Sequence, residues 1–150
     1  MGAINSNVMG ALRGWLTTEA KALLETMPEE ERGTSVLMEN VAQMLTDGGR
    51  LAEAEVLQRE VLAAWRAKLG QRHPGTLAAL NNLAVNLYQQ RKHAEAAPLF
   101  QQAYDGRCEC LGEGHPSTLH TLGELGASKL ASGRVPVSYT HLTLPTICSL

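Results

Sequence analysis

The stretch LGQRHPGTLAALNNLAVNLY at residues 69–88 returns 42 residues later as LGEGHPSTLHTLGELGASKL at residues 111–130. The two copies share the pairs Leu-Gly, His-Pro and Thr-Leu, and two further leucines, at matching positions. The same offset carries the sequence AEA at 94–96 back onto AEA at 52–54. Self-similarity with a period of roughly 20 to 50 residues is typical of stacked-repeat proteins, in which each unit contacts mainly its neighbours. The pattern therefore favours a binding scaffold over a catalyst.

Each unit of this repeat predicts a helix, a tight turn and a second helix. Apolar residues in the central unit follow the i, i+3, i+4, i+7 spacing of a helix face, first at 80–87 and again at 96–103. Polar residues 89–92 separate the two faces, and the equivalent residues 47–50 contain two glycines, which end a helix readily. Pro74 and Pro116 suit the first turn of a helix, because the N–H groups there have no intrahelical partner.

Particular residues make this helical pattern testable. Pro98 falls in the second helix of the central unit, and we expect it at the edge of the first turn, in a helix that starts near Ala94. Ala84 is expected where the paired helices approach closely, and Gly126 takes its place in the third unit. The third unit has no matching second helix, so its leucines at 119, 122 and 125 are expected to lack their partner.

These residues resemble the tetratricopeptide repeat, whose ordinary period is about 34 residues. The longer period here, with His-Pro-x-Thr-Leu, Leu-Asn-Asn-Leu-Ala at 80–84 and Glu-Ala-Ala-Pro-Leu-Phe at 95–100, is similar to the kinesin light chain type. The resemblance spans about residues 28–134, divided into units at about 28–69 and 70–111 and a truncated unit at 112–134. It implies an all-α solenoid of helical hairpins, a right-handed superhelix of about two and a half repeats.

The two ends of the chain depart from the repeat. Residues 1–27 predict a leading amphipathic helix, which is either half of a degenerate preceding repeat, with Leu16 in the place of Phe100, or an unrelated capping helix. Residues 135–150 do not match the repeat, and 137–146 resemble the translation of a sequencing adapter. We therefore treat this tail as non-native and the chain as a fragment; the alternative is a natural disordered tail.

Composition excludes several classes of function. The formal net charge of −2 gives no long-range attraction to nucleic acid or to an anionic membrane. The first residues do not form a secretory signal, and no apolar run approaches the 18 or so residues that a membrane span needs. We therefore expect a cytoplasmic protein that has no membrane span and binds no nucleic acid.

Neither catalysis nor metal binding is predicted. His73 and His115 recur at one loop position per unit, which favours a structural role such as capping or bonding backbone groups. Cys108 and Cys110 are two residues apart on a helix, so their side chains point about 200° apart and cannot share a metal ion. We expect no catalytic residue, no metal site and no cofactor.

A ligand is expected in the concave groove that the first helices line. The resemblance implies that the asparagine at position 82 contacts a bound peptide, because an amide can both donate and accept hydrogen bonds. Asn40 holds the same place in the first unit, whereas Glu124 holds it in the third and breaks the ladder of asparagines. The predicted groove residues are Asn40, Gln43, Asn81, Asn82, Val85, Tyr88, His120 and Glu124.

The sequence thus predicts a scaffold that captures an extended or short helical protein segment, in the manner of a kinesin light chain cargo-adaptor module. The intact protein would bind a motor heavy chain or a cargo protein. A second hypothesis makes the array the regulatory part of a larger signalling enzyme, such as a nucleotide-driven switch protein. A third makes it a purely structural spacer. A heptad-patterned helix upstream would favour the first, and a phosphate-binding loop upstream would favour the second.

Overall fold

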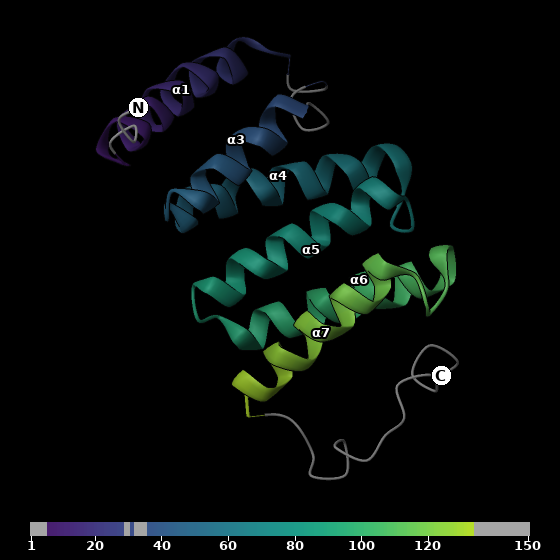
Figure 1. Ribbon diagram of the computed structural model, residues 1–150. Helices are drawn as coiled ribbons and strands as arrows, with labels where there is room; N and C mark the ends of the chain where they lie inside the picture. The colour runs from purple at the N-terminus through teal and green to yellow at the C-terminus, as the bar shows by residue number, and fades with distance from the viewer. Residues whose placement is uncertain (1–5, 29–30, 32–35, 134–150) are drawn as a thin grey trace. The chain divides into compact units, whose positions relative to one another are not determined.

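The computed structural model describes residues 6–28, 31 and 36–133. At residues 6–13 it describes the backbone only. All the elements in these ranges are helices (Figure 1). They are α1 (Ser6–Thr26), α3 (Val36–Asp47), α4 (Leu51–Leu69), α5 (Pro74–Gln89), α6 (His93–Leu111) and α7 (Pro116–Ala131). The suspected adapter at 135–150 lies outside the described residues. The all-α prediction is confirmed for the part of the chain that the structure describes.

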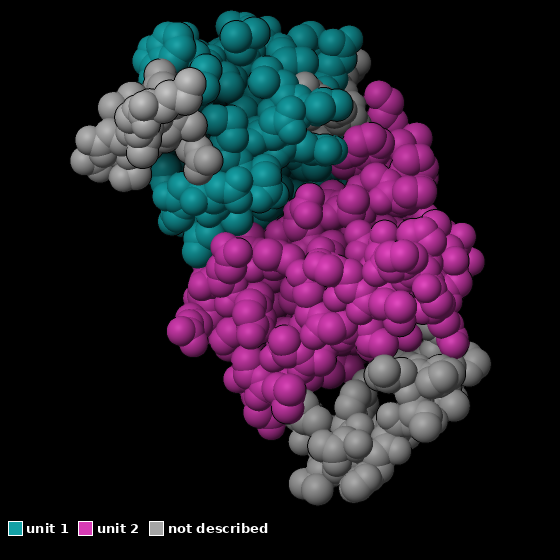
Figure 2. All heavy atoms as spheres, viewed as in Figure 1, with its two compact units in different colours: residues 1–64 teal, residues 65–150 magenta. Residues whose placement is uncertain are grey.

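The helix bounds reproduce the repeat. The bounds of α5 and α7 differ by 42 at both ends, and so do those of α4 and α6. The chain divides into two compact units, residues 1–64 and residues 65–150, coloured separately in Figure 2. In the second unit α6 packs against both α5 and α7, as expected for consecutive helices of a hairpin array. The predicted helix, turn and helix are confirmed for the first two units, as α3 with α4 and α5 with α6.

The His-Pro pairs start α5 and α7. His73 and His115 are the N-cap residues, both with extended backbone, and proline follows each at the first helical position. The Nδ1 atom of His73 accepts a hydrogen bond from the N–H of Gly75 at 3.1 Å, and Nδ1 of His115 accepts one from Ser117 at 3.2 Å. Each imidazole thus satisfies an N–H that the helix leaves unpaired. The predicted structural role of the two histidines is confirmed.

Replacing His115 by alanine should lower the free energy of unfolding by about 1 kcal/mol, because the cap acceptor is lost and α7 begins without it. His115→Asn should recover most of that loss, since asparagine is among the preferred N-cap residues. Urea unfolding followed by circular dichroism measures both variants. If the alanine and asparagine variants lose equal stability, the imidazole does not act as a cap.

The core of the second unit lies between α5 and α6. Leu80, Leu83 and Leu87 of α5 are each no more than 2% exposed, and Ala84 is completely buried. On α6 the largest buried side chains are Phe100 and Tyr104. The other buried residues of this helix are small: Ala96, Ala97, Ala103 and Gly106. Small residues on one helix opposite leucines on the other let the two backbones approach closely. This core therefore follows the two predicted apolar faces.

Pro98 lies deeper in α6 than expected. The helix begins at His93, with Lys92 as its N-cap, so the proline is the sixth helical residue. It is past the first turn, and the carbonyl of Ala94 loses the N–H that would normally bond to it. Both Pro98 and Ala94 are exposed, so water can satisfy that carbonyl. The helix starts one residue before the expected start near Ala94, and Pro98 lies past the edge of the first turn, so the expected position is wrong.

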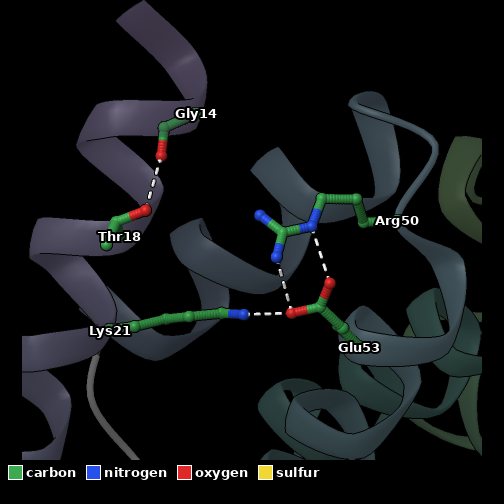
Figure 3. A network of polar contacts seen from close by, with 5 residues as sticks. All are labelled: Gly14, Thr18, Lys21, Arg50 and Glu53. Carbon is green, nitrogen blue, oxygen red and sulfur yellow. Dashed lines mark hydrogen bonds and ion pairs between the residues drawn. The ribbon is translucent and has the colours of Figure 1, made fainter. Parts of the chain in front are cut away.

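In the first unit, α1 packs against α3, and a polar network joins α1 to α4 (Figure 3). The ammonium of Lys21 donates to a carboxylate oxygen of Glu53 on α4. Arg50, just before α4, donates to the same carboxylate through Nε at 2.6 Å and Nη2 at 2.8 Å. Hydrogen bonds from Lys21 and then from Arg50 lower the pKa of Glu53 below its ordinary value.

The Glu53 network should stabilise the fold only above the acidic range. The pKa of Glu53 is lowered in the folded state, so its contribution is complete above the ordinary carboxyl pKa and is lost as the pH falls through the lowered value. The carboxylate is exposed to solvent, so we expect Glu53→Gln to cost only a few tenths of a kcal/mol at neutral pH. Unfolding of this variant and of Glu25→Gln, measured from neutral to acid pH, checks the effect. A difference from wild type that persists below the lowered pKa would contradict it.

Two of the three leucines named in the third unit are only partly covered, as expected, and the third is buried. Leu119 is 50% exposed and Leu122 is half-buried, but Leu125 is 1% exposed, so its expected lack of a partner is wrong. A Cβ atom added to Gly126 would meet no described heavy atom within 4 Å. The close helix approach that explains Ala84 therefore does not act at Gly126 within the described part of the chain.

Candidate functional site

The strongest candidate for a binding face is the exposed side of α5. Its start is fixed by the His73 cap, and its inner side is held by the buried leucines described above. Three residues spaced three apart then form one row along the helix: Asn82 is exposed, and Val85 and Tyr88 are half-buried. Residues three apart on a helix are neighbours on its surface. The row therefore presents a free amide, a branched aliphatic group and a phenol side by side.

A pocket lies at the C-terminal end of this row. It has a volume of about 320 Å³ and is lined by Tyr88, Gln89, Arg91, His93 and Ala131. The rings of Tyr88 and His93 meet edge to face, with centroids 4.7 Å apart and planes at 63°. The Nδ1 atom of His93 is buried and has no hydrogen-bond partner among the described residues. A buried polar atom without a partner is uncommon in a folded protein and leaves bonding capacity for a ligand.

Arg91, which lines the same pocket, has a strained backbone. Its φ of 65° lies in the left-handed region, which side chains other than glycine seldom adopt. The equivalent residues in the neighbouring units are Gly49, with φ 78°, and Gly133, with φ 67°. Strain of this kind persists where surrounding structure enforces it, and it is frequent at functional sites. The sequence analysis missed Arg91 and His93, although the replacement of a repeated glycine by arginine was visible in it.

Asn81 does not face the groove, and that expectation is wrong. Its side chain is 7% exposed, and its Oδ1 lies 3.2 Å from the hydroxyl oxygen of Thr121 on α7. That hydroxyl accepts a hydrogen bond from Nη1 of Arg107 on α6, which also donates to the carbonyl of Ser117 at 3.0 Å. Adjacent helical residues point about 100° apart, so Asn82 can be exposed while Asn81 is buried. Asn81 instead links α5 to α7.

The predicted residues of α7 interact with each other. Nδ1 of His120 lies 3.6 Å from Oε2 of Glu124, one helical turn away. That distance is too long for a hydrogen bond, and Oε2 has no hydrogen-bond partner among the described residues. Burial lowers the pKa of the Arg107 guanidinium below its ordinary value, while the negative charge of Glu124 acts in the opposite direction. Glu124 therefore offers a carboxylate where the other units offer an amide.

The remaining predicted residues belong to the first unit. Asn40 and Gln43 on α3 are both exposed, and Asn40 holds the repeat position of Asn82. The side-chain amide of Gln43 donates to Oδ1 of Asp47 at 2.8 Å. A ligand that bound Gln43 through the same amide proton would have to displace this bond. Of the two residues, Asn40 is thus the better candidate for ligand contact.

Other chemistry has little support. The described residues contain no group of three or more His, Cys, Asp or Glu side chains placed to hold a metal ion. Cys110 is a free, exposed thiol that donates to the carbonyl of Arg72 at 3.3 Å. None of the helices in the described ranges combines the length and the apolar character that crossing a membrane requires.

These features define the class of the protein. Helical hairpins repeated at a fixed offset, with an exposed polar and aromatic row on a first helix, are typical of helical-repeat scaffolds that bind other proteins. The pattern that defines the tetratricopeptide repeat matches residues 33–109, just over half of the sequence. The chain belongs to the tetratricopeptide repeat family, whose repeats generally mediate protein–protein interaction and are typically non-enzymatic. No curated protein matches the chain.

Proposed function

We propose that the chain is a non-enzymatic interaction module that binds a protein segment along the exposed face of α5. The observation that carries this proposal is the row of Asn82, Val85 and Tyr88, which leads into the pocket at Arg91 and His93. Asn82 is exposed in the middle of α5, and asparagine is a mediocre helix former, so folding alone does not favour it there. A binding role gives a reason for its position.

The mode of binding follows from the chemistry of the row. The amide of Asn82 can donate to a peptide carbonyl and accept from a peptide N–H at the same time, whatever the side chain of that peptide residue. Val85 and Tyr88 supply apolar contact on either side of these bonds. The pocket beyond Tyr88 is large enough to take a side chain of the bound segment. Backbone bonds at Asn82 would give affinity, and the pocket would give specificity.

Alanine at Asn82 or Tyr88 is expected to weaken peptide binding about tenfold, because each removes a contact of about 1 to 2 kcal/mol. Peptides selected from a random library against the wild-type chain serve as ligands, and fluorescence anisotropy gives their Kd. Gln71→Ala is the control, since it removes an exposed amide from the loop before α5. If the selected peptides bind Asn82→Ala and Tyr88→Ala as tightly as wild type, the α5 face is not the binding site.

The more specific role that we propose is a cytoplasmic cargo-adaptor module like that of a kinesin light chain. Its support is the 42-residue period, which both the sequence and the helix bounds display. The partners of the intact protein would then be a cargo protein or a motor heavy chain. The test is to purify the intact protein from cell extract and look for a motor heavy chain and for cargo proteins. Asn82→Ala should abolish co-purification of cargo but not of the motor heavy chain, which would separate these two partners.

A further inference from the structure

The pocket beyond Tyr88 differs in its chemistry from the same place in the first unit. Its volume is about 320 Å³, and its lining includes Tyr88, Gln89, Arg91 and His93. One repeat length earlier, these four positions are held by Thr46, Asp47, Gly49 and Leu51. Both units nevertheless form the same helix, turn and helix. The repeat fold therefore does not require the aromatic, basic and polar side chains that the central unit has there.

Arg91 is unfavourable for the fold. Its backbone is left-handed, with φ at 65°, a conformation that side chains disfavour and glycine tolerates. Glycine holds this position in the first unit, at 49, and in the third, at 133. Backbone strain of this kind is frequent at functional sites. What arginine adds at this position is a guanidinium group, in a residue that lines the pocket.

The charges around the pocket favour an anion. None of the described residues that line it carries a carboxylate, whereas Arg91 is always positively charged, and Tyr88 and Gln89 add hydrogen-bond donors. The nearest carboxylate in sequence, Glu95, is exposed and is not among the lining residues. The pocket also lies where α6 begins, at His93, and no side chain of the described residues caps that helix end, unlike those of α5 and α7. The N–H groups and the dipole at a helix N-terminus attract negative charge.

We propose that this pocket binds an anionic side chain of the protein segment held along α5, and that Arg91 is the residue that selects it. The inference rests on the proposed function, because the segment must lie along the exposed face of α5 for its side chain to reach the pocket. The anionic group is a carboxylate or a phosphoryl group. Both present oxygens that a guanidinium binds through paired hydrogen bonds.

The geometry of α5 sets the distance between this side chain and the backbone that Asn82 holds. Asn82 and Tyr88 are six residues apart, which is about 9 Å along a helix. An extended segment covers that distance in about three residues. The anionic residue should therefore come about three residues before or after the residue that is bonded to Asn82.

The test uses peptides selected from a random library against the full 150-residue chain. Acidic residues should be enriched at one position of the selected peptides. For one such peptide, the acidic residue is replaced by its neutral amide and, separately, by phosphoserine, and fluorescence anisotropy gives each Kd. The amide version should bind wild type about tenfold more weakly than the acidic one. Tighter binding of the phosphoserine version would assign the pocket to a phosphoryl group, and weaker binding would assign it to a carboxylate.

Arg91→Gly separates the role of the side chain from the stability of the fold. This variant should bind the acidic peptide as weakly as wild type binds the amide peptide, and its affinity for the amide peptide should be unchanged. It should also melt a few degrees above wild type, because glycine relieves the left-handed strain. Weaker binding by a more stable protein cannot result from unfolding.

Two further variants control for charge. Arg91→Lys keeps both the charge and the strain, so it should melt like wild type and retain part of the preference for the acidic peptide. Arg72→Ala removes an arginine from the loop before α5, at the other end of that helix, where its side chain is 77% exposed. It should bind both peptides like wild type.

Other results would overturn the inference. Selected peptides without an acidic preference, or equal affinity of wild type for the acidic and amide peptides, would mean that the pocket does not read an anion. An equal loss of both peptides in Arg91→Gly would mean that Arg91 acts on the segment as a whole. Asn82→Ala then distinguishes the two proposals. If it still weakens binding, the α5 face remains the binding site and only the role of Arg91 fails; if it does not, the proposed function fails as well.

Discussion

Phe100→Ala is expected to lower the free energy of unfolding by about 3 to 5 kcal/mol, the usual cost of deleting a buried aromatic side chain. Phe100 is 1% exposed and is the largest purely apolar side chain in the core between α5 and α6. Because domains are commonly stable by only about 5 to 15 kcal/mol, this one change would remove a large part of the stability. The second unit of this variant should then unfold at a clearly lower temperature and urea concentration than wild type.

The repeat supplies a matched control for this variant. Leu16 holds the position of Phe100 in α1 but is 48% exposed, so Leu16→Ala should change stability by about 0.5 kcal/mol or less. Thermal and urea unfolding of the two variants give the comparison. Equal losses in both would mean that Phe100 is not packed as described, or that the face of α1 around Leu16 is covered in solution. Concentration dependence of the Leu16→Ala loss would identify the second case.

Gly106→Ala and Gly123→Ala should change stability in opposite directions, and differ by about 1 to 3 kcal/mol. Both glycines are inside helices, so both substitutions gain about 1 kcal/mol of helix propensity, and this gain cancels in the comparison. The Cβ at Gly106 would come within 2.4 Å of Leu77 Cδ2, whereas at Gly123 it would meet nothing within 4 Å. Leu77 is buried, so its side chain cannot move aside freely.

Urea unfolding of the two glycine variants, with the free energies compared at one temperature, measures that difference. Leu77→Ala combined with Gly106→Ala is the check on mechanism, because removing the opposing side chain should also remove the clash. If Gly106→Ala is as stabilising as Gly123→Ala, α6 does not approach α5 as closely as the structure has it. Non-additivity in the double variant would confirm that the two residues are in contact.

Sequence reasoning predicted the parts of the fold that local chemistry and periodicity determine. The His-Pro pairs gave the starts of α5 and α7, and the histidine caps follow because Nδ1 can accept from the N–H two residues later. The apolar spacing gave the buried faces of α5 and α6. Asn82 was expected on the surface, and it is exposed. In each case a residue and its near neighbours carry the information.

The features that were missed depend on contacts between helices. Asn81 is buried because Thr121 and Arg107 on two other helices supply its polar surroundings, and no local pattern encodes that meeting. The strain at Arg91 arises because arginine holds a left-handed turn position that glycine holds at 49 and 133. Gly126 was expected at a close helix approach because Ala84 holds that position in the central unit, but the helix that would approach it is absent from the described residues. The position of a residue in the repeat therefore predicts its place on a helix better than it predicts which side chains surround it.

The buried polar link between Asn81, Thr121 and Arg107 has a consequence for the order of the repeats. The repeat equivalent of Thr121 is Ala79, and the equivalent of Arg107 is Trp65, so no other described pair of neighbouring units carries the same three groups. If the central unit were copied into the place of the third, a methyl group would replace the Thr121 hydroxyl, and Asn81 and Arg107 would each lose a bond. The repeats look interchangeable in sequence, yet these hydrogen bonds make the third unit specific to its place after the central one.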